Sequence, residues 1–171
     1  MSAVPRWFER KFEFTFPVEQ FPNLRVRLRG TPARLEEMFA GRDREILIQK
    51  PGGKWPAQEH AGHLLDLEPL WAQRLEDFVL GNSELTAADL SNRKTDEAHH
   101  NTRRVEQILK TFRKQRVQLV DRIAEIDLIS VNRTILHPRL KQPMRLVDHL
   151  YFAAEHDDHH LARIWELLQT S

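Results

Sequence analysis

The ten residues from Glu155 to Ile164, EHDDHHLARI, carry three histidines and three carboxylates in their first six positions. They lie within residues 144–168, where apolar residues recur at helical spacing. Residues four apart lie on one face of a helix, one turn above the other. The rings of His156 and His160 can therefore point at a single ion, and we expect the rest of the chain to hold this pair opposite a third ligand.

The spacing leaves a second register open. His156 and His159 are three residues apart and could pair instead, with His160 turned away. We favour His156 and His160, because their face continues through apolar residues, whereas His159 lies on a mixed face with charged neighbours. A polar helix face or a hydrogen-bonded interior pair is the alternative to a metal site.

A third ligand must come from another helix, because one helix supplies only two on one face. His63, in the run AGHLLDLE of residues 61–68, has apolar neighbours that favour an inward position. Gly62 beside it would let another backbone segment or a ligand approach closely. Three neutral imidazoles around a divalent ion such as zinc, nickel or iron leave positions open for water and substrate, which is typical of a catalytic site.

Other residues near these histidines have two interpretations each. His149 lies seven residues before His156 on roughly the same face. It could be a general base, a pocket residue, an alternative ligand or a hydrogen-bonded interior histidine. His60 could support the ligands or face solvent. Four carboxylates could orient ligand imidazoles or simply be solvated or cap a helix: Glu59, Asp66, Glu155 and Asp157.

Composition restricts the class of protein. The 171 residues fit one domain, with 40% apolar and 30% charged residues. Lys and Arg number 26 against 25 Asp and Glu, so no strong field favours nucleic acid or an anionic membrane. Without cysteine the chain has neither disulfides nor thiolate ligands. No signal peptide or membrane-spanning run is evident, and we expect a cytoplasmic protein.

Helical periodicity predicts four long helices, at about residues 31–50, 55–80, 96–126 and 144–168. Thr31 and Pro32 look like the cap and first position of the first helix, and Pro69 predicts a kink in the second. Residues 1–30 are expected to be an irregular, aromatic strap, with residues 31–171 forming the bundle in a single domain. The connections at 82–96 and 127–143 are expected near the open end of the site. The basic residues of the third helix, among them Arg113 and Arg116, are expected on a solvated face.

The combination of Trp55, the run HLLDLE at 63–68, His137-Pro138, the run MRL at 144–146 and EHDDHHLARI at 155–164 resembles the DinB-like superfamily, which includes YfiT-type proteins and thiol-dependent transferases. The resemblance covers residues 31–168. It implies an all-α, up-down-down-up four-helix bundle that binds a divalent metal through one histidine of the second helix and a pair from the fourth. These roles map onto His63, His156 and His160. It also implies homodimers and, in some relatives, a low-molecular-weight thiol.

Two functions follow from these expectations. The first is a metal-dependent enzyme, in which the metal activates a thiol or a water for thiol S-transfer or hydrolysis of a small molecule. The second is a metal-binding or stress-response module without catalysis. A nucleic-acid-binding protein using the basic face of the third helix is a weaker third, because the net charge is close to zero.

Overall fold

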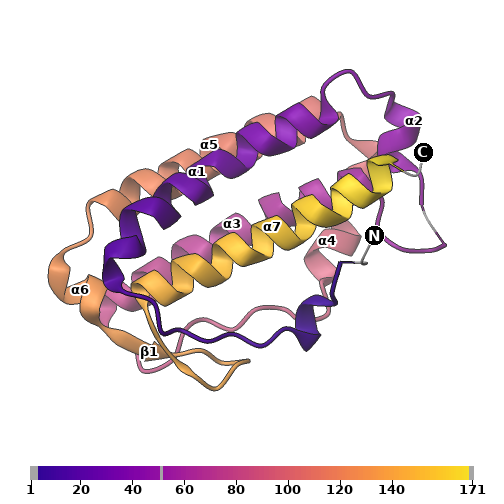
Figure 1. Ribbon diagram of the computed structural model, residues 1–171. Helices are drawn as coiled ribbons and strands as arrows, with labels where there is room; N and C mark the ends of the chain where they lie inside the picture. Colours follow the sequence, from indigo (N-terminus) through magenta and orange to yellow (C-terminus); the bar gives the residue numbers. More distant parts are fainter. Residues whose placement is uncertain (1–3, 51, 170–171) are drawn as a thin grey trace.

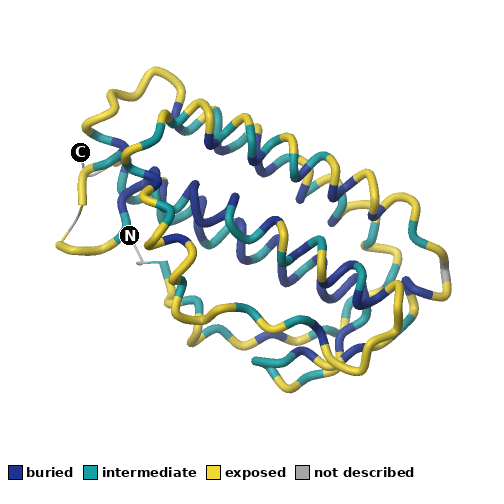
Figure 2. Tube along the Cα trace, turned by 180° about the vertical axis from the view of Figure 1, so that it is seen from behind, coloured by how far each residue is buried: buried dark blue, intermediate teal, exposed yellow. Residues whose placement is uncertain are grey.

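The computed structural model of the protein describes residues 4–50 and 52–169. Its four long helices are α1 (Phe21–Phe39), α3 (Ala57–Leu80), α5 (Val105–Ala124) and α7 (Leu146–Gln169). Each carries a buried stripe that faces the other helices, while the outer faces are exposed (Figures 1 and 2). The predicted all-α four-helix bundle is confirmed. No helix of the described residues is long and apolar enough to cross a bilayer.

The helices follow an up-down-down-up order. α1 packs against α5 and α7, and α3 packs against the same two helices, so α1 and α3 are diagonal to each other. Arg27 and Arg34 of α1 reach Asp158 of α7, and the more N-terminal Arg27 also reaches the more N-terminal Glu155, so these two helices are parallel. Contacts between the other pairs make α3 and α5 parallel, and make α1 antiparallel to α5 and α3 antiparallel to α7.

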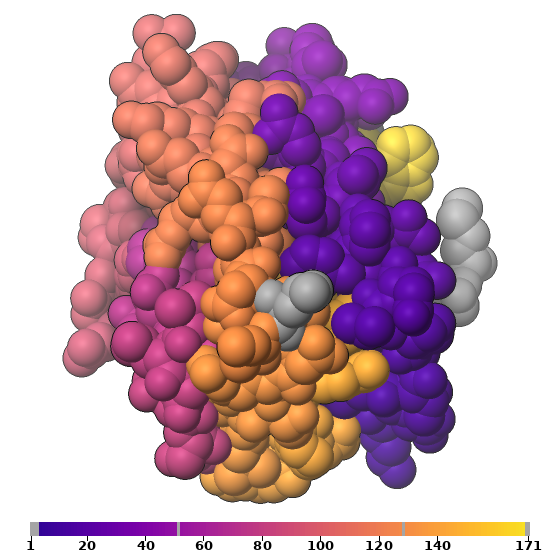
Figure 3. Space-filling view, turned by 90° about the vertical axis from the view of Figure 1, so that its left-hand side faces the viewer, coloured from indigo at the N-terminus to yellow at the C-terminus, as the bar shows by residue number. Residues whose placement is uncertain are grey.

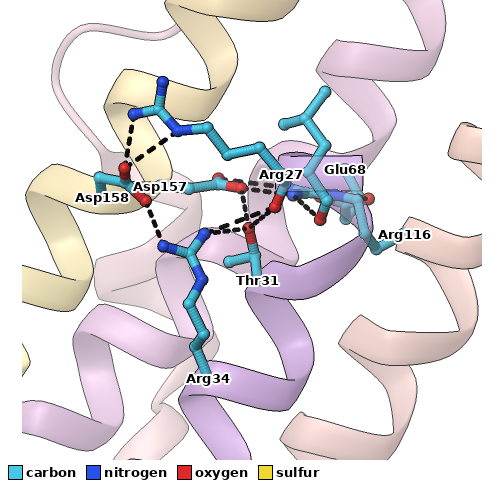
Figure 4. Close-up of polar contacts among 8 residues, drawn as sticks. Arg27, Thr31, Arg34, Glu68, Arg116, Asp157 and Asp158 are labelled. Carbon is cyan, nitrogen blue, oxygen red and sulfur yellow. Dashed lines mark hydrogen bonds and ion pairs between the residues drawn. The ribbon is translucent and has the colours of Figure 1, made fainter. Parts of the chain in front are cut away.

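A buried polar layer divides the core into two apolar clusters. Thr31, Glu68, Arg116 and Asp157 each lie between residues of the two clusters on their own helix, so every long helix contributes one member. Arg116 pairs with both Glu68 and Asp157, and the Thr31 hydroxyl donates to Asp157 at 2.7 Å (Figure 4). The expectation that Arg116 lies on a solvated face is wrong, because its side chain is fully buried.

The first helix begins ten residues earlier than predicted, at Phe21, and contains Pro32. Pro32 has no N–H to donate to the carbonyl of Leu28, four residues before it. The Arg116 Nη1 atom donates to that carbonyl instead, at 3.2 Å. Tertiary contacts from α5 and α7 therefore override a local helix-start signal. The irregular N-terminal segment extends only to Gln20 and contains the short turns η1 (Trp7–Glu9) and η2 (Val18–Gln20).

Two other boundaries differ from prediction. α1 ends at Phe39, before Gly41 in the left-handed region at φ +69°, and a separate short helix, α2 (Arg44–Ile48), follows. The predicted third helix is divided into α4 (Arg93–Ala98), the turn η3 (His100–Thr102) and α5. His99, at φ +49°, separates the first two of these. α3 continues through Pro69 and ends at Gly81, which has a left-handed conformation.

The connection from α5 to α7 carries structure that the sequence did not predict. It contains α6 (Leu128–Asn132) and an antiparallel hairpin of β1 (Thr134–Leu136) and β2 (Pro143–Arg145). Figure 3 shows this orange part of the chain at one end of the bundle, between the magenta α3 and the indigo N-terminal part. In Figure 1 the N-terminal segment and the two long connections run along the α3 and α7 side, where the candidate site lies.

Candidate metal centre

Three histidine side chains meet between α3 and α7. His63 comes from α3, and His156 and His160 come from successive turns of α7. One ring nitrogen of each lies within 4.8 Å of those of the other two, and all three residues are buried. His159 is outside this group, so the geometry favours the pair His156 and His160 over the alternative register.

The spacing of the nitrogens suits a small divalent ion. The Nε2 atoms of His156 and His160 are 3.2 Å apart. Two ligands of a tetrahedral zinc ion, each about 2.0–2.1 Å from the metal, lie about 3.3 Å from each other. All three ligands are neutral nitrogen donors, which suit zinc, nickel and iron. Three protein ligands leave at least one coordination position for water or substrate.

Two further side chains fix the orientation of the imidazoles. The hydroxyl oxygen of Thr95, on α4, lies 3.0 Å from Nδ1 of His63. Nδ1 of His60 lies 2.8 Å from Nδ1 of His160, so these rings share a hydrogen bond. With Nδ1 engaged in this way, Nε2 of both His63 and His160 remains available to a metal. His60 therefore has the supporting role that was one of its two interpretations, whereas sequence reasoning missed Thr95.

Of the two interpretations given for the four carboxylates, the one in which they orient the ligand imidazoles is wrong. Each is bound to another group: Glu59 to Asn101, Asp66 to His100, Glu155 to Arg10 and Arg27, and Asp157 to Arg116 and Thr31. The last two fasten α7 to its neighbours, so they hold the helix that carries the ligands without touching the rings. Figure 4 shows the Asp157 side chain directed into the buried polar layer.

Gly62 makes room for a residue that packs beside the site. A methyl group built on Gly62 would overlap the ring of His100, which is fully buried. That ring is held by Asp66, with Nε2 and Oδ2 2.8 Å apart, and Gln58 donates to the His100 carbonyl at 2.6 Å. A close approach was expected here from a backbone segment or a ligand, and the structure places the His100 imidazole there instead.

Burial keeps the site neutral. It lowers the pKa of His63 to about 4 and, together with the neighbouring His63, that of His60 to about 3. Burial also holds the pKa values of His156 and His160 well below the ordinary value. Neutral imidazole is the form that binds metal, so the environment prepares all three ligands at neutral pH.

The three histidines line the wall of a cavity of about 440 Å³. Aromatic rings cover much of the remaining wall: Trp7 lies 4.9 Å and Trp71 5.8 Å from the His156 ring centroid, and Trp55 lies 5.0 Å from that of His63. The N-terminal strap contributes Trp7, and the connections contribute residues 87–90, 92 and 137–139. Both long connections therefore lie at the site, as expected.

His149 is not where a pocket base would be. It is absent from the cavity wall and is buried behind Trp71, with ring centroids 5.6 Å apart, and against Phe78. Burial and the nearby Arg74 hold its pKa well below the ordinary value. The expectation that His149 lines the pocket is wrong because Trp71 occupies that position. His159, considered only as a rival ligand, does line the cavity.

Comparison with known proteins agrees with this arrangement. No curated protein matches the chain in sequence. The solved structure of YfiT from Bacillus subtilis, described as "a probable metal-dependent hydrolase with an unusual four-helix bundle topology", superposes with a TM-score of 0.82 at 19% identity, over 95% of this chain and 93% of that one. A mycothiol-dependent maleylpyruvate isomerase superposes with a TM-score of 0.68 at 10% identity, over 91% of this chain and 67% of that one. The sequence profile of the DinB superfamily matches residues 27–164, and the chain belongs to that superfamily.

Proposed function

We propose that this protein is a metal-dependent enzyme that acts on a small molecule, by hydrolysis or by transfer of a thiol. One observation carries the proposal: three buried, neutral imidazoles converge on one point in the wall of a cavity of about 440 Å³. A purely structural metal site is closed by four protein ligands, whereas a three-ligand site beside a cavity admits a reactant. The description of YfiT as a probable metal-dependent hydrolase supports a metal-dependent reaction, and the mycothiol dependence of the isomerase supports a thiol as one reactant.

His63, His156 and His160 would hold the ion, with Thr95 and His60 fixing the first and last of them. A bound divalent ion would supply a Lewis acid that lowers the pKa of a coordinated water or thiol. The aromatic walls exclude bulk water and hold the apolar part of a reactant beside the imidazoles. His159, with its ring centroid 5.2 Å from that of His160, takes the place of His149 as the candidate proton acceptor.

Metal content is the first test. The protein is purified without a histidine tag, and metal per chain is measured by elemental analysis for the wild type and for His63→Ala, His156→Ala and His160→Ala. His159→Ala is the matched control, because it removes an imidazole of the same helix outside the triad. We expect about one ion per chain in the wild type and control and a loss of metal in the three variants. Unchanged metal content in the three variants would refute the assignment.

Chelation separates the enzyme from a non-catalytic metal module. In the enzyme, the apolar clusters and the buried polar layer carry the fold, so the chelated protein stays folded and only its activity is lost. Hydrolysis of activated esters and thiol transfer to an electrophile are the assays for the two reaction classes. Unfolding on chelation, without activity in either assay, would favour the module. The homodimer implied by the resemblance stays a prediction, which light scattering would test.

A further inference from the structure

Two arginines line the cavity without a carboxylate partner. Arg74 and Arg139 form no ion pair with any described residue. Arg74 is almost completely buried, with 2% of its surface exposed. A buried charge without an ion-pair partner is costly, so a ligand that supplied the counter-charge would be bound favourably here.

Both guanidinium groups still have donors to offer. The Nη2 atom of Arg139 is buried and has no hydrogen-bond partner among the described residues. Arg74 uses Nε to donate to the Thr86 carbonyl at 2.9 Å, and its Nη1 lies 3.3 Å from His137. The buried carboxylate of Asp77, three residues along the chain, acts to raise the pKa of Arg74, but its oxygens accept hydrogen bonds from Asn82 and the Thr86 N–H. Burial lowers the pKa of Arg74 to about 10, so the group remains charged at neutral pH.

The indole of Trp71 adds a third donor. Trp71 is 4% exposed and lines the cavity, and its Nε1 atom is buried without a hydrogen-bond partner in the described part of the chain. The Arg74 guanidinium lies 5.5 Å from the ring of Trp71. An unsatisfied buried N–H is uncommon in a native protein, because leaving it unpaired costs a large part of a hydrogen bond.

These donors lie one aromatic ring away from the metal centre. Arg74 packs over Trp71, whose ring centroid is 5.8 Å from that of His156. Arg139 packs 5.9 Å from the ring of Trp7, which lies 4.9 Å from the same histidine. A molecule that reaches the three histidines with one end can therefore bring its other end to the arginines.

Charge in the cavity suits a monoanion. Asp89 is the acidic residue of the wall, and it is exposed at the mouth, where its carboxylate accepts hydrogen bonds from the Ser91 and Arg93 N–H groups. Among the residues of the wall, two cations and one carboxylate leave a single positive charge, which Asp77, outside the wall, offsets in part. The fork of a guanidinium matches a planar carboxylate, and the aromatic rings match an apolar body between the two ends.

We propose that the cavity holds a subsite for the carboxylate of a small organic anion, formed by Arg74, Arg139 and the indole N–H of Trp71. As an assignment of the substrate's class, this rests on the proposed function. The substrate is then a monocarboxylate whose reacting group lies beside the three histidines and whose carboxylate lies in the arginine subsite. Binding of the carboxylate itself does not require the metal.

Calorimetry with matched pairs of ligands tests the subsite. Phenylacetate and 4-phenylbutyrate are titrated into the purified protein, each against its uncharged amide. A carboxylate held by buried arginines should bind at least about tenfold more tightly than its amide. The same titrations on metal-depleted protein, with depletion verified by elemental analysis, show where the preference arises. A preference that persists without metal belongs to the arginines, and one that vanishes belongs to the metal and overturns the proposal.

Arg139→Met removes one cation from the subsite, and Arg104→Met is its control. Both variants lose one positive charge. Arg104 is highly exposed and lies outside the cavity, so its replacement leaves the subsite intact. We expect Arg139→Met to abolish most of the preference for the carboxylate while metal content stays that of the wild type, and Arg104→Met to keep the preference. Equal binding of acid and amide by the wild type, no saturable binding of either acid, or an unchanged preference in Arg139→Met would overturn the subsite. If the wild type contains no metal as purified and takes up none when metal is added, but still prefers the acids, the metal-dependent enzyme is refuted and the subsite stands.

Discussion

Arg116 on α5 donates a hydrogen bond to the main-chain carbonyl of Leu28 on α1, at 3.2 Å, and so satisfies the carbonyl that Pro32 leaves free. The same guanidinium pairs with Glu68 and Asp157, so one side chain links all four long helices. Burial raises the pKa of Glu68, and the pairing with Arg116 offsets part of that rise. The network therefore depends on the arginine more than on any other member.

Arg116→Met should lower the free energy of unfolding by about 3–5 kcal/mol, because it leaves two carboxylates buried without a cation. Urea unfolding measures the change. Arg113→Met on the same helix is the control, since Arg113 pairs with Glu36 near the surface and its loss should cost under about 1 kcal/mol. Equal losses in the two variants would show that the buried network contributes nothing special.

The polar layer also explains why the start of α1 could not be predicted from sequence. Thr31 followed by Pro32 has the local chemistry of a helix start. Within the helix, Asp157 accepts a hydrogen bond from the Thr31 hydroxyl, and Arg116 donates to the Leu28 carbonyl that Pro32 leaves free; both partners are more than eighty residues away. The second and fourth helices were predicted closely because their apolar stripes are continuous and Gly81 ends the former. The pair His156 and His160 was predicted from helical spacing, which is local, whereas His63 was proposed from its apolar neighbours and from the family resemblance. Thr95 and the cavity arginines were missed because only tertiary packing brings them to the site.

Two helix glycines should respond to alanine with opposite signs. Gly30 in α1 has no atom within 4 Å of the position a methyl group would take, so Gly30→Ala should stabilise the protein by about 0.5–1 kcal/mol through helix propensity. Gly62→Ala should destabilise it by about 1–3 kcal/mol, because the methyl group would displace the His100 ring from Asp66. Thermal unfolding of the two variants gives the comparison. Stabilisation by both would mean that His100 moves aside freely.

The groups that orient the imidazoles should tune metal affinity without abolishing it. Thr95→Val keeps the shape of the side chain and removes the hydroxyl that lies 3.0 Å from Nδ1 of His63. Loss of such a partner typically weakens metal binding by about 10–100-fold. Competition with a chromophoric chelator measures the affinity, and Thr111→Val is the control, because that hydroxyl donates only to a carbonyl of its own exposed helix turn. An affinity equal in both variants would show that Thr95 does not orient His63.

The metal-free protein should lose stability as the pH falls. Seven histidines have a lowered pKa in the folded protein, chiefly through burial: His60, His63, His137, His149, His156, His159 and His160. In the unfolded chain these groups take up protons near the ordinary pKa of about 6.5, whereas burial keeps them neutral to a lower pH in the folded protein, with a pKa of about 4 for His63 and His159. The unfolded state therefore binds more protons below about pH 6.5, and stability is complete above that pH and falls below it.

Each fully buried histidine should contribute about 1.4 kcal/mol per pH unit to this decline. Urea unfolding at about pH 7.5 and about pH 5.5 measures the total, and His149→Leu reduces it by one histidine, because that ring lies against Trp71 and Phe78 outside the triad. The variant should show a shallower pH dependence than the wild type while keeping its metal site. A metal-free wild type that is as stable at the lower pH would mean that its histidines are protonated in the folded state, which the buried, mutually adjacent rings of His63, His156 and His160 oppose.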